Sequence, residues 1–349
     1  MARRKFDSGP TIWDVAKECN VSIATVSQVL NNGPRPVRPD TRERVITAAK
    51  KLNYHPNAMA RGLVSRRMNT IGVVSGVFNA VDVVGNPYAA SVLRGILAGA
   101  AASGFGVLLF TQWWEDLQNS GSVYRDRRAD GVVAIAPADN NVMISGMVAF
   151  NMPVVAISGD CLSLGVPSVD VDNAKGARIA AQHFVHLGHK RVAHITGNAH
   201  LVATRLRRGA FIDTLDKAGI EVPDRYIRVG HYNGSGAYEH AASLLSEPDP
   251  PTAIFAGNDS IALLVLQAAH DLGVRVPEDL SVIGFDDIGL ADHSRPALTT
   301  VRQPLASVGE MAAKLLIARV ESGSSEPQLH LIDPDLTVRE TTAPPRPGR

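Results

Sequence analysis

Residues 23 to 28 combine short polar and apolar side chains that could reach base-pair edges in a DNA groove. Gln28 carries an amide that can pair bidentately with adenine, and Ile23 and Ala24 can contact a thymine methyl group. This set predicts base readout by Ile23, Ala24 and Gln28. The alternative is an ordinary helical hairpin whose small polar face is only solvated.

Such side chains need a helix held at a fixed angle, and the flanking sequence predicts one. Thr11 followed by Asp14 has the pattern of a capping box, which starts a first helix. Asn20 lies in the following turn, where positive φ is expected and Asn tolerates it. Ser22 caps a second helix whose apolar residues recur at helical spacing. The stretch 11–32 therefore predicts a helix-turn-helix that presents its second helix to a major groove.

A third amphipathic helix is predicted over 40–53, and YHPNAMARGLVSRR follows at 54–67. Here the sequence strongly resembles the LacI/GalR family of bacterial transcription regulators. The resemblance covers roughly residues 10 to 342 and rests on these stretches, in family order: TIWDVAKECNVSIATVSQVLN, DTRERV, LNYHPNAMARGL, NTIGVV, RADGVV, LGHKRVAHI, FAGNDSIAL, SVIGFDD and LTTVRQP. It implies a transcriptional regulator, a repressor in type, that binds a pseudo-palindromic operator in double-stranded DNA as a homodimer. It also implies gating by a small-molecule effector.

Further residues are expected to touch the DNA backbone and position the second helix. They are Ser22, Thr25, Ser27, Asn31, Arg38, Thr41, Tyr54 and Asn57. The segment from Asn57 to Leu63 resembles the family's hinge helix, which implies that Leu63 is the apolar wedge inserted into the minor groove. Three departures stand out: Gln28 where Arg is usual, a loop at 33–39 with three prolines, and a helix-weakening Gly62.

The distribution of charge supports a DNA-binding module on a different body. The net charge is only +1, but residues 1–67 hold 13 Lys and Arg against 5 Asp and Glu. A basic module suits a reader of the phosphate backbone. The two cysteines are far apart and fit a reducing cytoplasm. No apolar run is long enough to span a bilayer, and no secretory signal follows the first residues, so a cytoplasmic protein with no membrane partner is expected.

From residue 70 onward, short apolar strands alternate with helices. The strands are predicted at 71–75, 107–111, 132–136, 154–158, 192–196, 253–256 and 281–285, and the helices at 89–103, 173–187, 207–218, 235–246 and 259–272. This alternation predicts an α/β body made of two doubly wound parallel sheets. The resemblance implies the two-lobe fold of periplasmic sugar-binding proteins, with an effector between the lobes.

The whole chain is therefore divided as follows. We expect a disordered basic arm at 1–9, a small all-α helix-turn-helix headpiece at 10–55, a hinge and linker at 56–69, the effector-binding and dimerisation body at 70–342 and a tail at 343–349. The N-lobe is assigned to about 70–168 and 299–326, and the C-lobe to about 169–298 and 327–342. The chain would cross between lobes near Val169, Leu298 and Pro327.

Ligands of open α/β sheets lie beyond the carboxyl ends of the strands, which selects a set of candidate effector contacts. Positions matching Arg207, Asn258 and Asp286 commonly contact the effector in the family, and those matching Tyr88 and Tyr232 commonly supply pocket walls. We place Arg207 at the start of its helix and Tyr88 in the loop after the first body strand. Gln303, near a lobe crossing, is a further candidate.

These side chains suit a sugar or sugar derivative, with a nucleoside or purine as the alternative effector. Arg and Asp offer fixed donors and acceptors to hydroxyl groups, and an aromatic face packs on a ring. For each Asp the alternative is a structural helix cap. A third possibility is a small-molecule binding protein without a regulatory role, which the helix-turn-helix disfavours.

Two further features bear on chemistry. Four histidines in HFVHLGHKRVAH have metal-like spacing but no Cys, Asp or Glu among them, so they are interpreted as helix-terminal residues and no metal is expected. The sequence contains no phosphate-binding loop, dinucleotide fingerprint or nucleophile elbow. We therefore expect neither an enzyme nor a cofactor.

Overall fold

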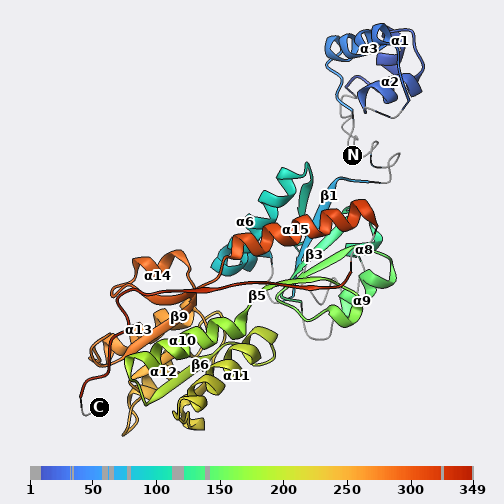
Figure 1. The fold of residues 1–349 in the computed structure, drawn as a ribbon. Helices are drawn as coiled ribbons and strands as arrows, with labels where there is room; N and C mark the ends of the chain where they lie inside the picture. The colour runs from blue at the N-terminus through green and yellow to red at the C-terminus, as the bar shows by residue number, and fades with distance from the viewer. Residues whose placement is uncertain are drawn as a thin grey trace, which may run out of the picture. The chain divides into compact units, whose positions relative to one another are not determined.

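The computed structural model describes residues 9–31, 33, 35–56, 62, 67–76, 80–111, 122–137, 142–323 and 326–347. The chain separates into two compact units, Met1–Asn69 and Thr70–Arg349 (Figure 1). We call them the headpiece and the body. In the part of the chain described, no helix combines the length and hydrophobicity that crossing a membrane requires.

The headpiece contains three short helices around one small core. They are α1 (Ile12–Glu18), α2 (Ile23–Leu30) and α3 (Pro39–Lys51). Val15, Val26 and Val45, one from each helix, are fully buried and join the three helices. The helix-turn-helix predicted from the sequence is therefore present.

The caps that were expected to set this geometry are in place. The Thr11 N–H donates to Asp14 Oδ2 at 2.8 Å, and Ser22 Oγ accepts from the Thr25 N–H at 3.1 Å. Asn20 has φ of 48° in the turn between α1 and α2. These contacts satisfy backbone donors that a helix start leaves open, so residues close in sequence set where α1 and α2 begin.

The first sheet of the body is entirely parallel, with strand order β11-β5-β4-β3-β1-β2. Its strands are β1 (Thr70–Ser75), β2 (Gly106–Leu109), β3 (Gly131–Ile135), β4 (Val154–Ile157), β5 (Ser168–Val171) and β11 (Leu329–Ile332). The helices of this lobe are α5 (Ala80–Gly85), α6 (Pro87–Ala102), α8 (Ser122–Arg125), α9 (Val142–Ala149) and α15 (Leu305–Ser322). We call this lobe the N-lobe.

The second sheet has the order β12-β10-β9-β8-β6-β7, and only β12 is antiparallel to its neighbour. Its strands are β6 (Val192–Thr196), β7 (Ile227–Val229), β8 (Ala253–Ala256), β9 (Ser281–Asp286), β10 (Thr299–Arg302) and β12 (Asp335–Thr337). Its helices are α10 (Asn173–Leu187), α11 (Val202–Lys217), α12 (Ala237–Leu245), α13 (Asp259–Asp271) and α14 (Gly289–His293). This is the C-lobe, and the two sheets confirm the predicted α/β body.

The chain passes between the lobes after β5, after β10 and after β11. The crossings predicted near Val169, Leu298 and Pro327 are each displaced toward the C-terminus by a few residues. The reason is strand pairing: β10 pairs with β9 of the C-lobe, and β11 pairs with β5 of the N-lobe. β11 and β5 are far apart in the sequence, so local patterns do not reveal that pairing.

Helices α6 and α15 cross at very close range in the N-lobe (Figure 1). A Cβ atom at Gly95 would lie 1.9 Å from the carbonyl oxygen of Ala306, and one at Gly309 would lie 2.0 Å from that of Val92. Only glycine allows backbones to approach this closely. The position of α6, which begins beside the site described below, is therefore fixed by α15.

The C-terminal segment after β12 runs along the C-lobe and is bound to it. Thr341 Oγ1 donates to the carbonyl oxygen of Val282 at 2.7 Å, and His189 Nε2 lies 3.0 Å from the carbonyl oxygen of Ala343. Burial lowers the pKa of His189 to about 4, so this imidazole is neutral near pH 7 and donates to Ala343. His194 also makes a structural contact, from Nδ1 to the carbonyl oxygen of Phe255 at 2.8 Å.

Candidate functional site

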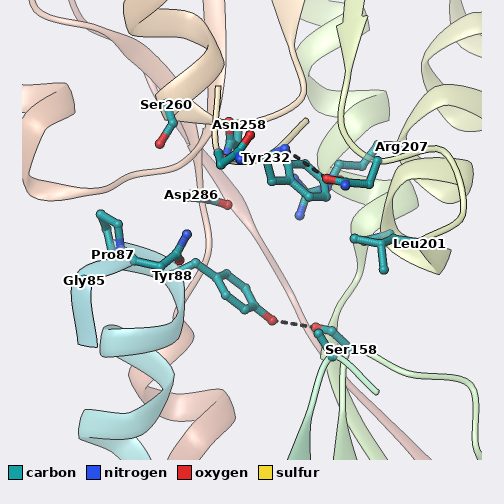
Figure 2. Close-up of a pocket in the computed structure, with 15 residues that line it drawn as sticks. Gly85, Pro87, Tyr88, Ser158, Leu201, Arg207, Tyr232, Asn258, Ser260 and Asp286 are labelled. Carbon is teal, nitrogen blue, oxygen red and sulfur yellow. Dashed lines mark hydrogen bonds between the residues drawn. The ribbon is translucent and has the colours of Figure 1, made fainter. Parts of the chain in front are cut away.

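A cavity of about 570 Å³ lies between the lobes, at the carboxyl ends of strands from both sheets (Figure 2). The residues that line it are Gly85, Asn86, Pro87, Tyr88, Ala136, Ser158, Asn198, Leu201, Ala203, Arg207, Tyr232, Asn233, Asn258, Ser260 and Asp286. Five of the six predicted effector contacts are in this set. Gln303 is outside it, although its side chain is buried behind Asp286.

Arg207 is the cation of the cavity, and its position is set from three sides. Its Nε donates to Asn173 Oδ1 at 2.8 Å and its Nη1 donates to the carbonyl oxygen of Gly257 at 2.6 Å. The guanidinium carbon lies 3.6 Å from the centroid of the Phe285 ring. Only 5% of the residue is exposed, so its planar fork is held rigid with donors left for a ligand.

Arg207 does not open its helix, as the sequence predicted. Helix α11 begins at Val202, so Arg207 lies in its second turn. The N-cap, Leu201, provides no side-chain hydrogen bond. The usual polar signal for a helix start is therefore missing, and the boundary could not be found from residue types.

Asn258 and Tyr232 support each other on the C-lobe side. Asn258 caps α13, since its Oδ1 accepts from the Ile261 N–H at 3.0 Å, and its Nδ2 donates to the carbonyl oxygen of Tyr232 at 2.9 Å. Asn258 therefore both caps α13 and lines the cavity. The Tyr232 hydroxyl accepts from Thr204 Oγ1 at 2.9 Å.

Asp286 ends β9 in a strained turn. Asp286 has φ of 121° and Asp287 has φ of 59°, two consecutive non-glycine residues in a costly region. Gln303 Nε2 donates to Asp286 Oδ1, and Arg339 Nη2 donates to Asp287 Oδ1 at 2.7 Å. Gln303, which follows β10, and Arg339, in the C-terminal segment, thus stabilise the turn at the edge of the cavity.

Burial raises the pKa of Asp286 to about 6, against the opposing effects of the Arg207 charge and the Gln303 hydrogen bond. Burial and the neighbouring Asp286 raise the pKa of Asp259 well above its usual value as well. Asp259 does not face the cavity. Its Oδ2 accepts from the Ile288 N–H at 2.9 Å, which ties the residue after the strained turn to α13.

Tyr88 is the main aromatic contribution from the N-lobe, and it lies on α6 rather than in a loop. Asn86 caps this helix by accepting from the Ala89 N–H at 3.1 Å, and Pro87 occupies its first turn. The Tyr88 hydroxyl contacts Ser158 Oγ at 2.8 Å (Figure 2). The predicted irregular loop is therefore interrupted by α5 and ends at a capped helix.

Several lining residues were not singled out from the sequence. Asn198 and Ser158 follow the carboxyl ends of β6 and β4, so the strand-end rule could have found both. Asn198 accepts from the Tyr232 N–H at 3.0 Å. Ser260, beside the cap of α13, had the same signal through its neighbour Asn258. Trp113 and Trp114, which follow the predicted strand at 107–111, lie outside the described residues.

The headpiece places the predicted base-reading residues on one short helix, in different environments. Ala24 is exposed, whereas Ile23 is partly buried against the headpiece core. Gln28 Nε2 donates to the carbonyl oxygen of Arg35 at 2.9 Å. Gln28 therefore contacts the proline-containing loop through this bond.

The predicted backbone contacts that the structure describes belong mostly to exposed or partly exposed positions. They are Ser22, Thr25, Ser27, Asn31, Arg38, Thr41 and Tyr54. Short bonds order some of them: Asn31 Nδ2 donates to Ser27 Oγ at 3.1 Å, and the Ser22 and Thr25 hydroxyls are 2.9 Å apart. Asn57 and Leu63 lie outside the described residues.

Within the described residues, no group of three or more His, Cys, Asp or Glu side chains is arranged to hold a metal ion. Of the residues lining the cavity, Asp286 has the carboxylate and Arg207 the cation, and each is bonded to buried structural partners. The arrangement can bind and orient a polar ligand.

Comparisons with known proteins agree with this architecture. Residues 11–57 match the family "Bacterial regulatory proteins, lacI family", and residues 181–342 match "Periplasmic binding protein-like domain". The chain is 31% identical over 338 residues to catabolite control protein A of Priestia megaterium, covering 95% of this chain and 99% of that protein. It is equally 31% identical to the HTH-type transcriptional repressor PurR of Escherichia coli O139:H28, covering 95% of this chain and 97% of the repressor.

Solved structures give the same result. The lac repressor dimer bound to operator and the anti-inducer ONPF superposes with a TM-score of 0.84 at 26% identity, covering 96% of this chain and 100% of that one. The complex of the transcriptional regulator CelR with cellobiose superposes with a TM-score of 0.72 at 30% identity, covering 95% and 99%. The capped helix-turn-helix, the two-lobe body and these relatives lead to one conclusion: the chain belongs to the LacI family of bacterial regulatory proteins and is a DNA-binding transcription regulator.

Proposed function

We propose that this regulator is a repressor that binds a pseudo-palindromic operator as a homodimer, and that a neutral sugar or sugar derivative in the interlobe cavity changes its affinity for DNA. The observation that carries the ligand class is the balance of charge in the cavity. Arg207 and Asp286 offset each other, and the other polar lining groups are the neutral side chains of Asn, Ser and Tyr. Such groups match vicinal hydroxyls rather than a phosphate, which favours several cations.

The aromatic walls also favour a sugar over a flat heterocycle. Tyr232 lies directly against Gly197, where an added Cβ would be 2.2 Å from the ring Cζ, and the Arg207 Cζ is 5.6 Å from the ring centroid. Tyr88 is tied to Ser158 by its hydroxyl. Little aromatic surface is therefore open for a base to stack on both sides. A nucleoside or purine remains the second candidate, because Arg207 and Asp286 could pair with the edge of a heterocycle.

For the headpiece we propose base readout by Ile23, Ala24 and Gln28 and phosphate contacts by Ser22, Thr25, Ser27, Asn31, Arg38, Thr41, Tyr54 and Asn57. Leu63 is proposed as the minor-groove wedge, on the family resemblance of its segment. An apolar wedge unstacks a base step at a cost of a few kcal/mol, which the contacts along the bent duplex offset. Family membership and the exposure of Ala24 on α2 support this assignment.

A thermal-shift panel tests the ligand class. The panel contains D-ribose, D-glucose, cellobiose, glucose 6-phosphate, adenosine and hypoxanthine. A compound at a hundredfold its dissociation constant adds about 2.7 kcal/mol to the native state. We expect a neutral sugar to raise the melting temperature, and to change the affinity for an operator selected from random DNA. Stabilisation only by glucose 6-phosphate or hypoxanthine would contradict the proposed ligand class.

Variants then connect the shift to the cavity. Arg207→Ala should remove the sugar-induced shift while operator binding without sugar is retained. Arg208→Ala is the matched control, since Arg208 is the next residue of α11 and is exposed. Loss of both sugar response and DNA binding in Arg207→Ala, but not in Arg207→Lys, would show that Arg207 is structural instead.

A further inference from the structure

Asp170 is a buried carboxylate that touches neither the cavity nor a cation. It lies on β5, between Val169 and Val171, and is 8% exposed. In the described part of the chain, no Lys, Arg or His side chain forms an ion pair with it. Burying a carboxylate without such a partner is costly, and Asp170 points to the face of the strand opposite to that of Val169 and Val171, which pack in the apolar core. The position therefore calls for a role beyond folding.

Three hydrogen bonds compensate Asp170, and they come from both sides of a lobe crossing. Oδ1 accepts from Ser158 Oγ at 2.7 Å and from the Val171 N–H at 2.8 Å. Oδ2 accepts from Asn173 Nδ2 at 3.2 Å. Ser158 follows β4 of the N-lobe, whereas Asn173 opens α10 of the C-lobe.

Each partner of Asp170 holds a residue of the cavity wall. On the C-lobe side, Asn173 Oδ1 accepts from Arg207 Nε at 2.8 Å. On the N-lobe side, Ser158 has one proton, and it is donated to Asp170, so its oxygen must accept from the Tyr88 hydroxyl at 2.8 Å. The carboxylate at the centre thereby sets which group donates and which accepts in each hydrogen bond of the series Tyr88–Ser158–Asp170–Asn173–Arg207.

The pKa shifts of Asp170 and Tyr88 agree with this geometry. Burial raises the pKa of Asp170, and the bonds from Ser158, Val171 and Asn173 together with the Arg207 charge oppose the rise. Burial also raises the pKa of Tyr88 above its usual range, so its phenol keeps the proton that it donates to Ser158. Tyr88 is thus in the protonation state that its hydrogen bond to Ser158 requires.

We propose that Asp170 is a positioning residue that aligns Arg207 of the C-lobe with Tyr88 of the N-lobe, without itself touching the ligand. This inference rests on the proposed function of the cavity. A ligand that moves Arg207 would move the amide of Asn173, and through Asp170 and Ser158 it would move the Tyr88 hydroxyl. Tyr88 lies in the first turn of α6, which the glycine crossing fixes to α15. Asp170 therefore joins the recognition wall to the N-lobe scaffold.

The test uses the full chain labelled with 3-fluorotyrosine, without ligand or DNA. The chain has 6 tyrosines, and Tyr88→Phe identifies the fluorine resonance of Tyr88. Arg207→Lys keeps the positive charge but removes the Nε–H that Asn173 accepts. We expect Arg207→Lys to shift the Tyr88 resonance in the otherwise native chain and to leave it unshifted when Asp170→Asn is also present.

Two controls separate positioning from general destabilisation. Ser168→Ala removes a buried hydroxyl two positions earlier on the same strand, one with no hydrogen-bond partner in the described structure, and should preserve the shift. The other five tyrosine resonances report whether each variant is folded. A shift that persists in Asp170→Asn, or no shift in either background, would overturn the proposal.

A functional readout follows for the sugar that stabilises the native chain in the panel. Asp170→Asn should weaken binding of that sugar by about tenfold, with the ligand-free operator affinity unchanged, and Ser168→Ala should change neither. If the Tyr88 resonance does not respond as expected, the positioning role of Asp170 is wrong, but the proposed ligand class is unaffected. A panel without a sugar hit would remove the ligand class while the fluorine result still decides the role of Asp170.

Discussion

The functional side chains of the headpiece and of the body differ in their exposure and in how far they are bonded to the rest of the fold. In the headpiece, Ala24 and Arg38 are exposed, and the fold is built by a separate core and by caps between residues close in sequence. In the body, Arg207 and Asp286 are 5% and 6% exposed and are bonded to buried partners far along the chain. The comparison teaches that exposed contact residues such as Ala24 and Arg38 can be changed independently of stability in the headpiece, whereas Arg207 and Asp286 of the body are part of the fold.

The largest expected effect concerns the cost of keeping Asp286 ionised. Its folded-state pKa of about 6 lies above the unfolded value near 4, so the folded chain holds this proton more tightly. Stability from this group is fully present below about pH 4 and is lost as pH rises to about 6. The total loss is about 3 kcal/mol, because each pKa unit corresponds to about 1.4 kcal/mol.

Asp286→Asn should therefore be more stable relative to the native chain at pH 7 than at pH 4, by about 3 kcal/mol. Urea unfolding of both proteins between pH 4 and 7.5 measures the difference. A difference that does not vary with pH would mean that Asp286 titrates normally. The body would then resemble the headpiece in keeping its functional charge apart from its stability.

The next effect concerns Gln28 and sharpens the headpiece side of the comparison. Gln28→Ala should reduce discrimination at one base pair by about 1–3 kcal/mol, while headpiece stability changes by no more than about 0.5 kcal/mol. Selection from random DNA measures the preference, and Arg38→Ala should instead weaken binding to all sequences. Uniform weakening by Gln28→Ala would show that its bond to Arg35 matters more than base contact.

A smaller loss is expected from the cap of the recognition helix. Ser22→Ala removes the oxygen that accepts from the Thr25 N–H and should lower headpiece stability by about 1 kcal/mol. Thermal unfolding followed by circular dichroism measures the change, and Ser22→Asp should restore most of the stability. Failure of Ser22→Asp to restore stability would indicate that the Ser22 contact with the Thr25 hydroxyl is the important one.

The smallest effect is expected at the ion pair between Lys51 and Glu18, 2.6 Å apart and largely exposed. Exposed pairs contribute little because water screens them and both side chains lose freedom. Lys51→Ala should leave the melting temperature of the headpiece unchanged within error at physiological salt. A clear decrease would show that the headpiece depends on long-range contacts, as the body does.

The parts of the molecule that could be predicted from sequence are those whose causes are local. Helix α10 was predicted at 173–187 and is found there, because Asp172 caps its start and Gly188, with φ of 90°, ends it. Strand β11 escaped prediction because its partner β5 is far away in the sequence, and β10 because its residues, TTVR, are not a continuous apolar run. The same contrast holds for the cavity. Arg207 and Asp286 follow recognisable stretches, whereas a lone carboxylate such as Asp170 carries no signal until Ser158 and Asn173 surround it.

The order of segments along the chain has a consequence for synthesis. The three headpiece helices are contiguous, so they can fold as soon as they leave the ribosome. Each lobe of the body, by contrast, includes elements that are synthesised late. They are α15 and β11 in the N-lobe, and β12 with the segment carrying Thr341 in the C-lobe. Helix α15 covers the N-lobe core with Leu316 and Val308, both buried. In a nascent chain the helix-turn-helix can therefore be folded while both lobes are still incomplete, and the interlobe cavity forms last.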